Sequence, residues 1–145
     1  MILVDANLLI YATYREAPQH QQTRAWLEEQ INSGIRIGLP WISLLAFLRI
    51  TTNPRVFERP LTGEQATEQV SEWLALASVW TPTATERHSK LLTQFLLDVG
   101  VGGNLVPDAH LAALSVEHGL ILCSTDRNFA QFTGLRWHNP LKGDK

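Results

Sequence analysis

The sequence contains a single cysteine, Cys123, among its 145 residues. One cysteine can neither form an internal disulfide nor supply a cysteine-based zinc site, so both of these frameworks are excluded. Cys123 ends the apolar run 120–123, where a small buried hydrophobe is the simplest interpretation. We therefore expect the chain to fold around one hydrophobic core, which its length and its 45% of hydrophobic residues allow.

Long apolar segments and an excess of basic residues are also missing. No apolar run approaches the ~18 residues of a membrane span, and the run Ile2–Val4 meets Asp5 too early for a signal peptide. We expect a cytoplasmic protein with no membrane partner. The net charge of −2 argues against nucleic-acid binding by a basic surface alone. It does not exclude a nuclease, because a metal ion offsets the charge of a carboxylate-rich site.

Short apolar runs alternate with helical patterns along the chain. Strands are predicted at 2–4, 35–39, 79–81 and 120–123, and helices near 6–11, 18–31, 41–52, 62–77, 83–100, 107–119 and 128–132. Two of these helices start at pairs that resemble capping boxes, Thr62 with Gln65 and Thr83 with Glu86. The alternation favours an α/β fold, a three-layer α/β/α sandwich with a mostly parallel central sheet. We expect a single domain over residues 1–141, with a polar tail at 142–145.

Three aspartates are candidates for a metal site. Asp5 directly follows the first strand, and Asp126 follows the strand 120–123. In an open parallel sheet, ligands gather beyond the carboxyl ends of the strands. Asp108 lies in the first turn of the helix that leads into the second of these strands. Three crowded carboxylates repel one another unless a hard cation lies between them, and Mg²⁺ or Mn²⁺ suits such oxygen ligands.

Each aspartate also has a local structural explanation. Asp5 could cap the first helix, Asp108 could interact with the dipole of its own helix, and Asp126 could order a turn. The spacing of the three residues alone leaves these alternatives open.

Several segments of the chain resemble PIN-domain nucleases. The similar segments are Val4–Ala12, Pro107–Leu114 and Cys123–Phe129. Three shorter segments resemble a subgroup of VapC-type toxins, and these are Leu39–Trp41, Phe47–Arg49 and Thr52–Pro54. Together the segments span nearly the whole chain in the expected order, which makes the combination more specific than any single motif.

The resemblance implies an α/β/α domain whose acids hold one or two Mg²⁺ or Mn²⁺ ions and cut RNA. Asp5, Asp108 and Asp126 are the acids that match the family pattern. The resemblance further implies a VapB-type antitoxin that blocks the site, and a homodimer. Asn7 and Thr125 adjoin two of the acids and are candidates to orient a metal-bound water, as is Asn104 in the glycine-rich loop.

Two positions depart from the family pattern. The second motif usually has a glutamate three residues before its arginine, and Ala46 stands there. The last motif often has a second acid where Asn128 stands. A degraded PIN domain that binds RNA or a protein partner without cutting is therefore an alternative. A phosphoacceptor receiver domain is disfavoured, because it needs an acid pair after the first strand and a late lysine.

The remaining candidates are basic and aromatic residues. Arg49, Arg55 and Arg59 follow one another at a helix end and beyond, where they form either a phosphate-binding patch or a solvated face. Core or interface positions, rather than platforms for stacking RNA bases, are predicted for Trp41, Trp73, Trp80 and Trp137. The histidines show no metal-binding spacing, and His110 is assigned no role.

Overall fold

The computed structural model describes residues 1–100, 103 and 105–142. Its elements are, in chain order, β1 (Ile2–Val4), α1 (Ala6–Thr13), α2 (His20–Asn32), β2 (Ile37–Gly38), α3 (Trp41–Thr51), α4 (Gly63–Leu74), β3 (Val79–Trp80), α5 (His88–Val99), α6 (Leu105–Glu117), β4 (Ile121–Cys123), the 3₁₀ helix η1 (Arg127–Gln131) and β5 (Trp137–His138). Among these residues, no helix combines the length and the apolarity that crossing a bilayer requires. Most of the predicted polar tail lies outside the described residues.

The strands form one sheet in the order β3-β2-β1-β4-β5, and every neighbouring pair is parallel. The register pairs Val4 of β1 with Cys123 of β4 and Leu3 with Gly38 of β2. A parallel sheet confirms the predicted fold class. Because all of the strands run the same way, the residues that follow each of them meet at a single edge of the sheet.

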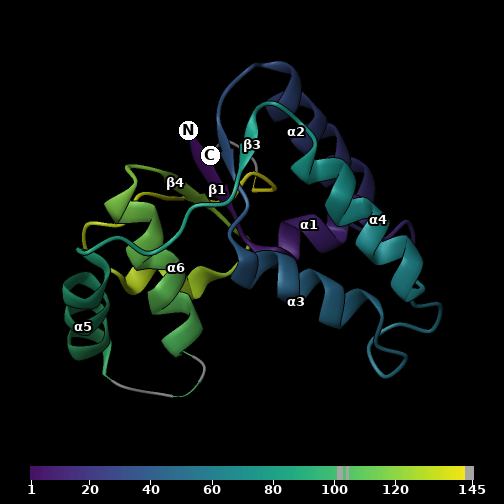
Figure 1. Cartoon of the computed structure of the whole chain (residues 1–145). Coiled ribbons are helices and arrows are strands. Elements are labelled where there is room, and N and C mark those ends of the chain that lie inside the picture. The colour runs from purple at the N-terminus through teal and green to yellow at the C-terminus, as the bar shows by residue number, and fades with distance from the viewer. Residues whose placement is uncertain (101–102, 104, 143–145) are drawn as a thin grey trace.

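Helices cover both faces of this sheet. Ile2 and Val4 of β1 pack into the core beneath α1 to α4, whereas Leu3 between them packs into the core beneath α5, α6 and η1. This alternation follows from the two-residue period of a strand. Figure 1 shows α5 and α6 on one side of the sheet and α1 to α4 on the other. The result is the expected three-layer sandwich.

Gly119 makes the tight connection from α6 to β4, and this connection matters for the site. α6 ends as predicted near Gly119, whose φ of +68° lies in the left-handed region that glycine adopts without penalty. The chain then returns at once to β4, and Leu120 is buried. Asp108 at the start of α6 is thereby tied to the strand that precedes Asp126.

Three sequence predictions were wrong or incomplete. The capping box at Thr62 is present, but α4 ends at Leu74 rather than near Ala77. The second capping box is absent: α5 begins only at His88, and its N-terminus has no side-chain cap. Thr85 in that segment is instead bonded to Glu117 of α6. β5 was not predicted, because a strand of two residues carries too little hydrophobic pattern to be recognised.

Candidate functional site

The three aspartates lie where the sequence placed them, at the starts of helical segments. Asp5 follows β1 and caps α1, its carboxylate accepting a hydrogen bond of 2.8 Å from the backbone N–H of Ala6. Asp126 follows β4 and caps η1, accepting a bond of 2.9 Å from the N–H of Asn128. Asp108 lies in the first turn of α6. Asp5 and Asp126 therefore do cap the helices that follow them, as their local explanations predicted. Capping a helix does not exclude a second role for either carboxylate.

Ser124 joins two of the aspartates. Its hydroxyl donates a 2.7 Å hydrogen bond to Asp5 Oδ2 and accepts one of 3.0 Å from the backbone N–H of Asp126. It also accepts a 3.1 Å bond from the side-chain amide of Asn7. Ser124 is fully buried, so this arrangement is shielded from competing water. It fixes the strand ends of β1 and β4 relative to each other at the point where their acids lie.

The pKa values of Asp5 and Asp108 are both raised, by burial and by the charges of neighbouring aspartates. Burial raises the pKa of Asp5 above its usual 3.8, against the hydrogen bonds from Ser124 and Ala6, and the charge of Asp126 adds to the rise. Burial also raises the pKa of Asp108 to about 6, and the charges of Asp126 and Asp5 raise it further. The three carboxylates thus lie close enough to repel one another. A cation among them would remove this repulsion.

The donor chemistry of the site suits a hydrated Mg²⁺ or Mn²⁺ ion. Besides the carboxylates, Asn7 Oδ1 is buried and has no hydrogen-bond partner in the structure, so it is free to accept a hydrogen bond from a bound water. In the described part of the chain, no three Asp, Glu, His or Cys side chains are arranged to hold one ion directly. Mg²⁺ usually keeps several waters and takes only one or two carboxylates. The residues therefore fit an ion bound partly through water.

The polar neighbours predicted from sequence have mixed outcomes. Asn7 takes part in the hydrogen-bond network around Asp5. The side chain of Thr125 forms no hydrogen bond with any of the described residues. Asn104 lies outside the described residues. Ser124 was missed, although the signal was present: it directly follows Cys123, the residue of β4 that pairs with the last residue of β1. Its burial could not be read from the sequence.

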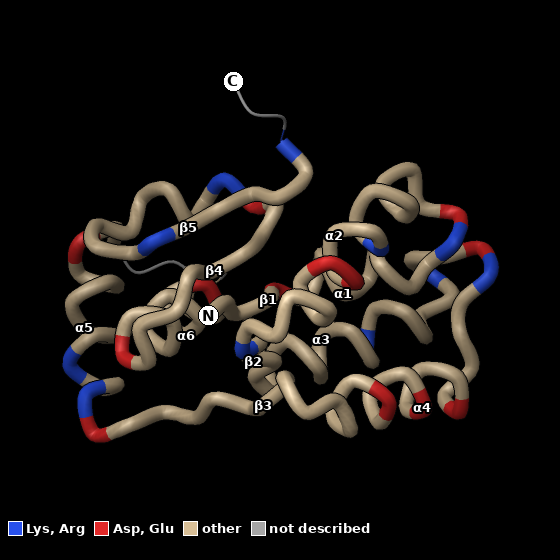
Figure 2. The backbone as a smooth tube through the Cα atoms, turned by 90° about the horizontal axis from the view of Figure 1, so that it is seen from above, with Lys and Arg blue, Asp and Glu red and all other residues tan. Residues whose placement is uncertain are grey.

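The three arginines are exposed and lie beyond the middle of α3. Arg49 is in the last turn of α3, and Arg55 and Arg59 lie in the segment that follows it. Arg59 forms a 3.5 Å ion pair with Glu16. Figure 2 shows Lys and Arg interspersed with Asp and Glu over the molecule, rather than gathered on one face. The prediction that these arginines bind phosphate stays a prediction.

A hydrogen-bonded group that the sequence did not reveal joins α5 and α6. His88 Nε2 and His110 Nδ1 share a hydrogen bond of 2.9 Å, and His88 Nδ1 donates to Glu117. Burial lowers the pKa of His110, and His88 lowers it further. Burial opposes ionisation of Glu117, but hydrogen bonds from Thr85 and His88 hold its pKa below the usual value. His88 is 22 residues from His110, so sequence spacing gave no sign of the contact.

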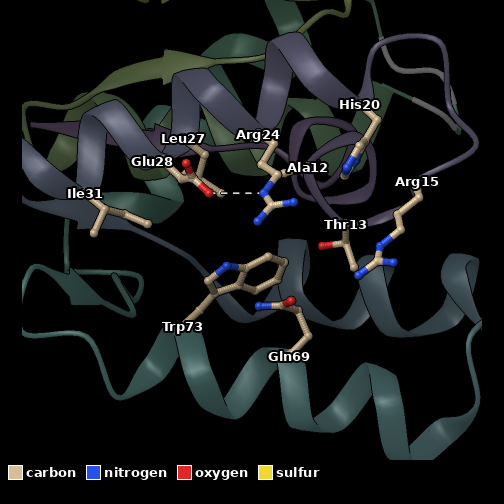
Figure 3. Close-up of a pocket in the computed structure, with 10 residues that line it drawn as sticks. All are labelled: Ala12, Thr13, Arg15, His20, Arg24, Leu27, Glu28, Ile31, Gln69 and Trp73. Carbon is tan, nitrogen blue, oxygen red and sulfur yellow. Dashed lines mark hydrogen bonds and ion pairs between the residues drawn. The ribbon is translucent and has the colours of Figure 1, made fainter.

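The pocket drawn in Figure 3 lies elsewhere on the molecule. It is a cavity of about 300 Å³ between the end of α1, α2 and α4, and Arg24 is paired with Glu28 at 3.1 Å along its wall. Trp73 and Gln69 of α4 face it from the other side. None of the three aspartates lines this pocket. The candidate site is instead the edge of the sheet at which Asp5 and Asp126 follow their strands.

Comparison with known proteins gives a consistent result over the whole chain. The family model described as the PIN domain matches residues 2–135. Ribonuclease VapC37 of Mycobacterium tuberculosis is 44% identical over 140 residues, which cover 97% of this chain and 97% of that protein. Ribonuclease VapC33 of the same species is 39% identical over 142 residues, covering 98% and 99%.

Solved structures share the fold at low sequence identity. DNA-bound VapBC from Salmonella typhimurium is similar with a TM-score of 0.66 and 18% identity, covering 97% of this chain and 99% of that chain. VapBC2 from Rickettsia felis, bound to a DNA fragment from its promoter, gives a TM-score of 0.65 and 17% identity, with coverage of 96% and 98%. These structures confirm the three-layer architecture.

Proposed function

The chain belongs to the PIN-domain family, and we propose that it is a metal-dependent endoribonuclease, the toxin of a VapBC-type pair. The observation that carries the catalytic part of the proposal is the hydrogen-bonded link from Asp5 to Asp126 through Ser124. The charges of both residues also raise the pKa of Asp108. The relatives with 44% and 39% identity are named as VapC ribonucleases, which supports RNA as the substrate.

In this proposal Asp5, Asp108 and Asp126 would hold an Mg²⁺ or Mn²⁺ ion, partly through water molecules. A bound divalent ion supplies an activated water nucleophile and offsets charge on the phosphate oxygens. Ser124 keeps the Asp5 carboxylate in one orientation, because its hydroxyl donates to Oδ2 while the N–H of Ala6 holds the other oxygen. Asn7 Oδ1 is available to accept a hydrogen bond from water at the site and so to orient it. The reaction is hydrolysis of an RNA phosphodiester.

The partners follow from the same family. The similar VapBC structures contain an antitoxin, by their names, and we propose a VapB-type antitoxin that blocks the site of this chain. We further propose that the chain forms a homodimer. With RNA as its substrate, the protein acts in the cytoplasm.

A degraded PIN domain that binds without cutting is the competing function. Its supporting observation is Ala46, where the family usually has a glutamate, together with Asn128 at a second acidic position. Purified protein incubated with labelled single-stranded RNA separates the two functions. Cleavage that needs Mg²⁺ or Mn²⁺, stops with a chelator and is lost in Asp5→Asn supports the nuclease. Binding without cleavage under all of these conditions supports the competing function.

The toxin assignment is tested in cells. Expression of the chain alone should arrest growth, and co-expression of the small protein encoded beside its gene should relieve the arrest. The Asp5→Asn variant serves as the control, since it should be tolerated without any partner. Harmless expression of the folded wild-type protein would contradict the toxin assignment.

A further inference from the structure

A second, smaller feature lies at the same edge of the sheet as the aspartates. It is a cavity of about 200 Å³ whose walls come from the residues after β2 and after β3, and from α6. Because β2 and β3 run parallel to β1 and β4, these walls lie on the edge that carries Asp5 and Asp126. Figure 1 shows α1 and α3 beginning together where β1 ends. The residues that line the cavity include Trp41, Pro82, Thr83 and His110.

Trp41 forms one wall and is unusually open to solvent. It is the first residue of α3, and 47% of its surface is exposed, whereas Trp73 is 6% exposed. The start of α3 holds it in place, since the carbonyl of Pro40 accepts hydrogen bonds from the N–H groups of Ser43 and Leu44. Trp41 is therefore not a core residue, and of the predicted core or interface location only the interface stays a prediction. A large aromatic surface faces solvent at the edge of the sheet that carries the proposed active site.

The opposite wall is fixed by α6. His118 Nε2 donates a 2.7 Å hydrogen bond to the carbonyl of Thr83, and the backbone N–H of Thr85 donates to Glu117. Pro82 packs directly on β2 because Gly38 has no side chain: a Cβ there would lie 3.0 Å from Pro82 Cγ. The segment after β3 is thus held at several points. The cavity is part of the packed structure rather than a gap in a loose loop.

His110 is the polar ring that lines the cavity. Its Nδ1 is bonded to His88, which is in turn bonded to Glu117, so the orientation of the ring is set. Within the described residues, Nε2 of His110 has no hydrogen-bond partner. His110 follows Asp108 by two residues on α6, so the two side chains lie on different faces of the helix. The cavity is related to the carboxylates by the edge of the sheet instead: the segment with Trp41 follows β2, and Asp5 follows the neighbouring strand β1.

We propose that this cavity is a subsite for one base of a single-stranded RNA substrate, which stacks on Trp41 and bonds to His110. The inference rests on the proposed ribonuclease function and specifies how the substrate is held. A cavity of about 200 Å³ is smaller than the ~300–1,000 Å³ of drug-sized ligand pockets, which suits a single base. Stacking on an aromatic side chain strengthens binding by roughly 5- to 150-fold per base. It would supply affinity that a chain with a net charge of −2 does not obtain from a basic surface.

A protein contact is the competing use of this surface. Leu45, one turn after Trp41 on α3, is 58% exposed, so the two residues together could also meet another protein chain. The two uses differ in the residues that they need. A stacked base needs Trp41 and His110, whereas an apolar protein contact needs Trp41 and Leu45.

The test measures RNA affinity without cleavage. The Asp5→Asn protein is titrated with a short fluorescein-labelled single-stranded RNA of mixed sequence, in chelator, and Trp41→Ala, Trp41→Phe, His110→Ala and Leu45→Ala are added to it singly. Trp41→Ala should weaken binding roughly tenfold or more, Trp41→Phe should retain most of the affinity, and His110→Ala should weaken binding. Leu45→Ala should leave it unchanged. Circular dichroism and thermal melts verify that each variant is folded.

The outcomes separate the possibilities. Unchanged RNA affinity in folded Trp41→Ala, together with metal-dependent cleavage by the wild type, would overturn the subsite and leave the ribonuclease function intact. A change in sedimentation mass in both Trp41→Ala and Leu45→Ala, with RNA affinity unaltered, would identify the surface as a protein contact. If the wild type neither binds nor cleaves RNA, the proposed function fails and the subsite fails with it.

Discussion

The hydroxyl of Ser124 donates a 2.7 Å hydrogen bond to Asp5 Oδ2, although the two residues are 119 positions apart in sequence. The contact exists because β1 and β4 are neighbours with Val4 paired to Cys123, so the next residue of each strand emerges at the same level. The hydroxyl oxygen of Ser124 also accepts a hydrogen bond from the backbone N–H of Asp126. The buried hydroxyl of Ser124 therefore connects Asp5, which follows β1, with Asp126, which follows β4.

Removal of this hydroxyl should impair catalysis. Ser124→Ala leaves the N–H of Asp126 and one oxygen of Asp5 without their partner, in a buried position where a lost hydrogen bond costs about 1–3 kcal/mol. We expect weaker metal binding and a marked loss of cleavage rate, with a lower melting temperature. Thr125→Ala is the matched control, because Thr125 is the next residue and lies outside the network. Equal cleavage rates for the two variants would contradict a positioning role for Ser124.

The carboxylates themselves should be indispensable for cleavage but not for folding. Asp5→Asn and Asp108→Asn each keep the shape of the side chain while removing the anionic ligand that a hard cation requires. We expect cleavage of labelled RNA to be abolished in both, with circular dichroism unchanged. Activity within a few-fold of the wild type in both variants would contradict the assignment of the metal site.

The contribution of Asp108 to the stability of the metal-free protein should fall as the pH rises through the acidic range. The pKa of Asp108 is raised from 3.8 to about 6 in the folded chain. The folded state therefore binds this proton more tightly than the unfolded state does, and stability is lost progressively between pH ~4 and ~6 as Asp108 ionises. Asp108 is only half-buried, so solvent screening reduces the effect to about 1 kcal/mol.

The difference between the wild type and Asp108→Asn isolates this contribution. In chelator the variant should melt about 2–4 °C above the wild type at neutral pH, and the gap should close near pH 4. Mn²⁺ should stabilise the wild type and reduce the gap. Melting curves whose separation does not change with pH would show that the carboxylate of Asp108 is not crowded.

Local patterns in the sequence predicted the elements, and the residues at their ends predicted part of the site. The positions of Asp5, Asp108 and Asp126 in the fold were predicted because the sequence marks each boundary plainly, as a strand end or as a helix start after Pro107. Their role as metal ligands stays a prediction. The parallel sheet then brings two of these boundaries together. The neighbouring helix start at Thr83 was misplaced, because α6 supplies its own partners to that segment, through Glu117 and His118.

Contacts between side chains on separate elements could not be predicted from the sequence. The bond from His88 to His110 depends on how α5 packs on α6, and neither residue carries a local signal of it. The same holds for the exposure of Trp41. Its aromatic ring suggests a core residue, and only its place at the start of α3 leaves it half-exposed.

The arginines after α3 should contribute to RNA affinity through phosphate contacts. Arg49, Arg55 and Arg59 are exposed, and Arg59 is paired only with an exposed glutamate at 3.5 Å. Each lost phosphate contact should reduce the slope of log K against log salt by about 0.7 for a single strand. The triple alanine variant, in the Asp5→Asn background, is compared with Arg24→Ala, which removes a charge from the pocket of Figure 3. An unchanged slope would show that the three arginines form a solvated face.

Ala46 is the position at which this chain departs most clearly from its family, and it offers a gain-of-function test. The structure confirms that it lies inside α3, half-buried, one turn before Arg49 and one turn after the buried Ser43. If this face of α3 borders the carboxylates, a glutamate at 46 adds an oxygen ligand. We expect Ala46→Glu to tighten Mn²⁺ binding on the order of tenfold, because more carboxylates raise the affinity for a hard cation.

The result is read from Mn²⁺ titrations and from thermal melts with and without the ion. Leu45→Glu is the control, since it adds the same charge to the adjacent, exposed position of α3. Without metal, Ala46→Glu should be less stable than the wild type, because the new carboxylate joins like charges, and Mn²⁺ should restore it beyond the wild type. Cleavage can rise or fall, as the added charge also repels the RNA phosphate. An Ala46→Glu protein that is destabilised and not rescued by Mn²⁺ would place Ala46 away from the metal site.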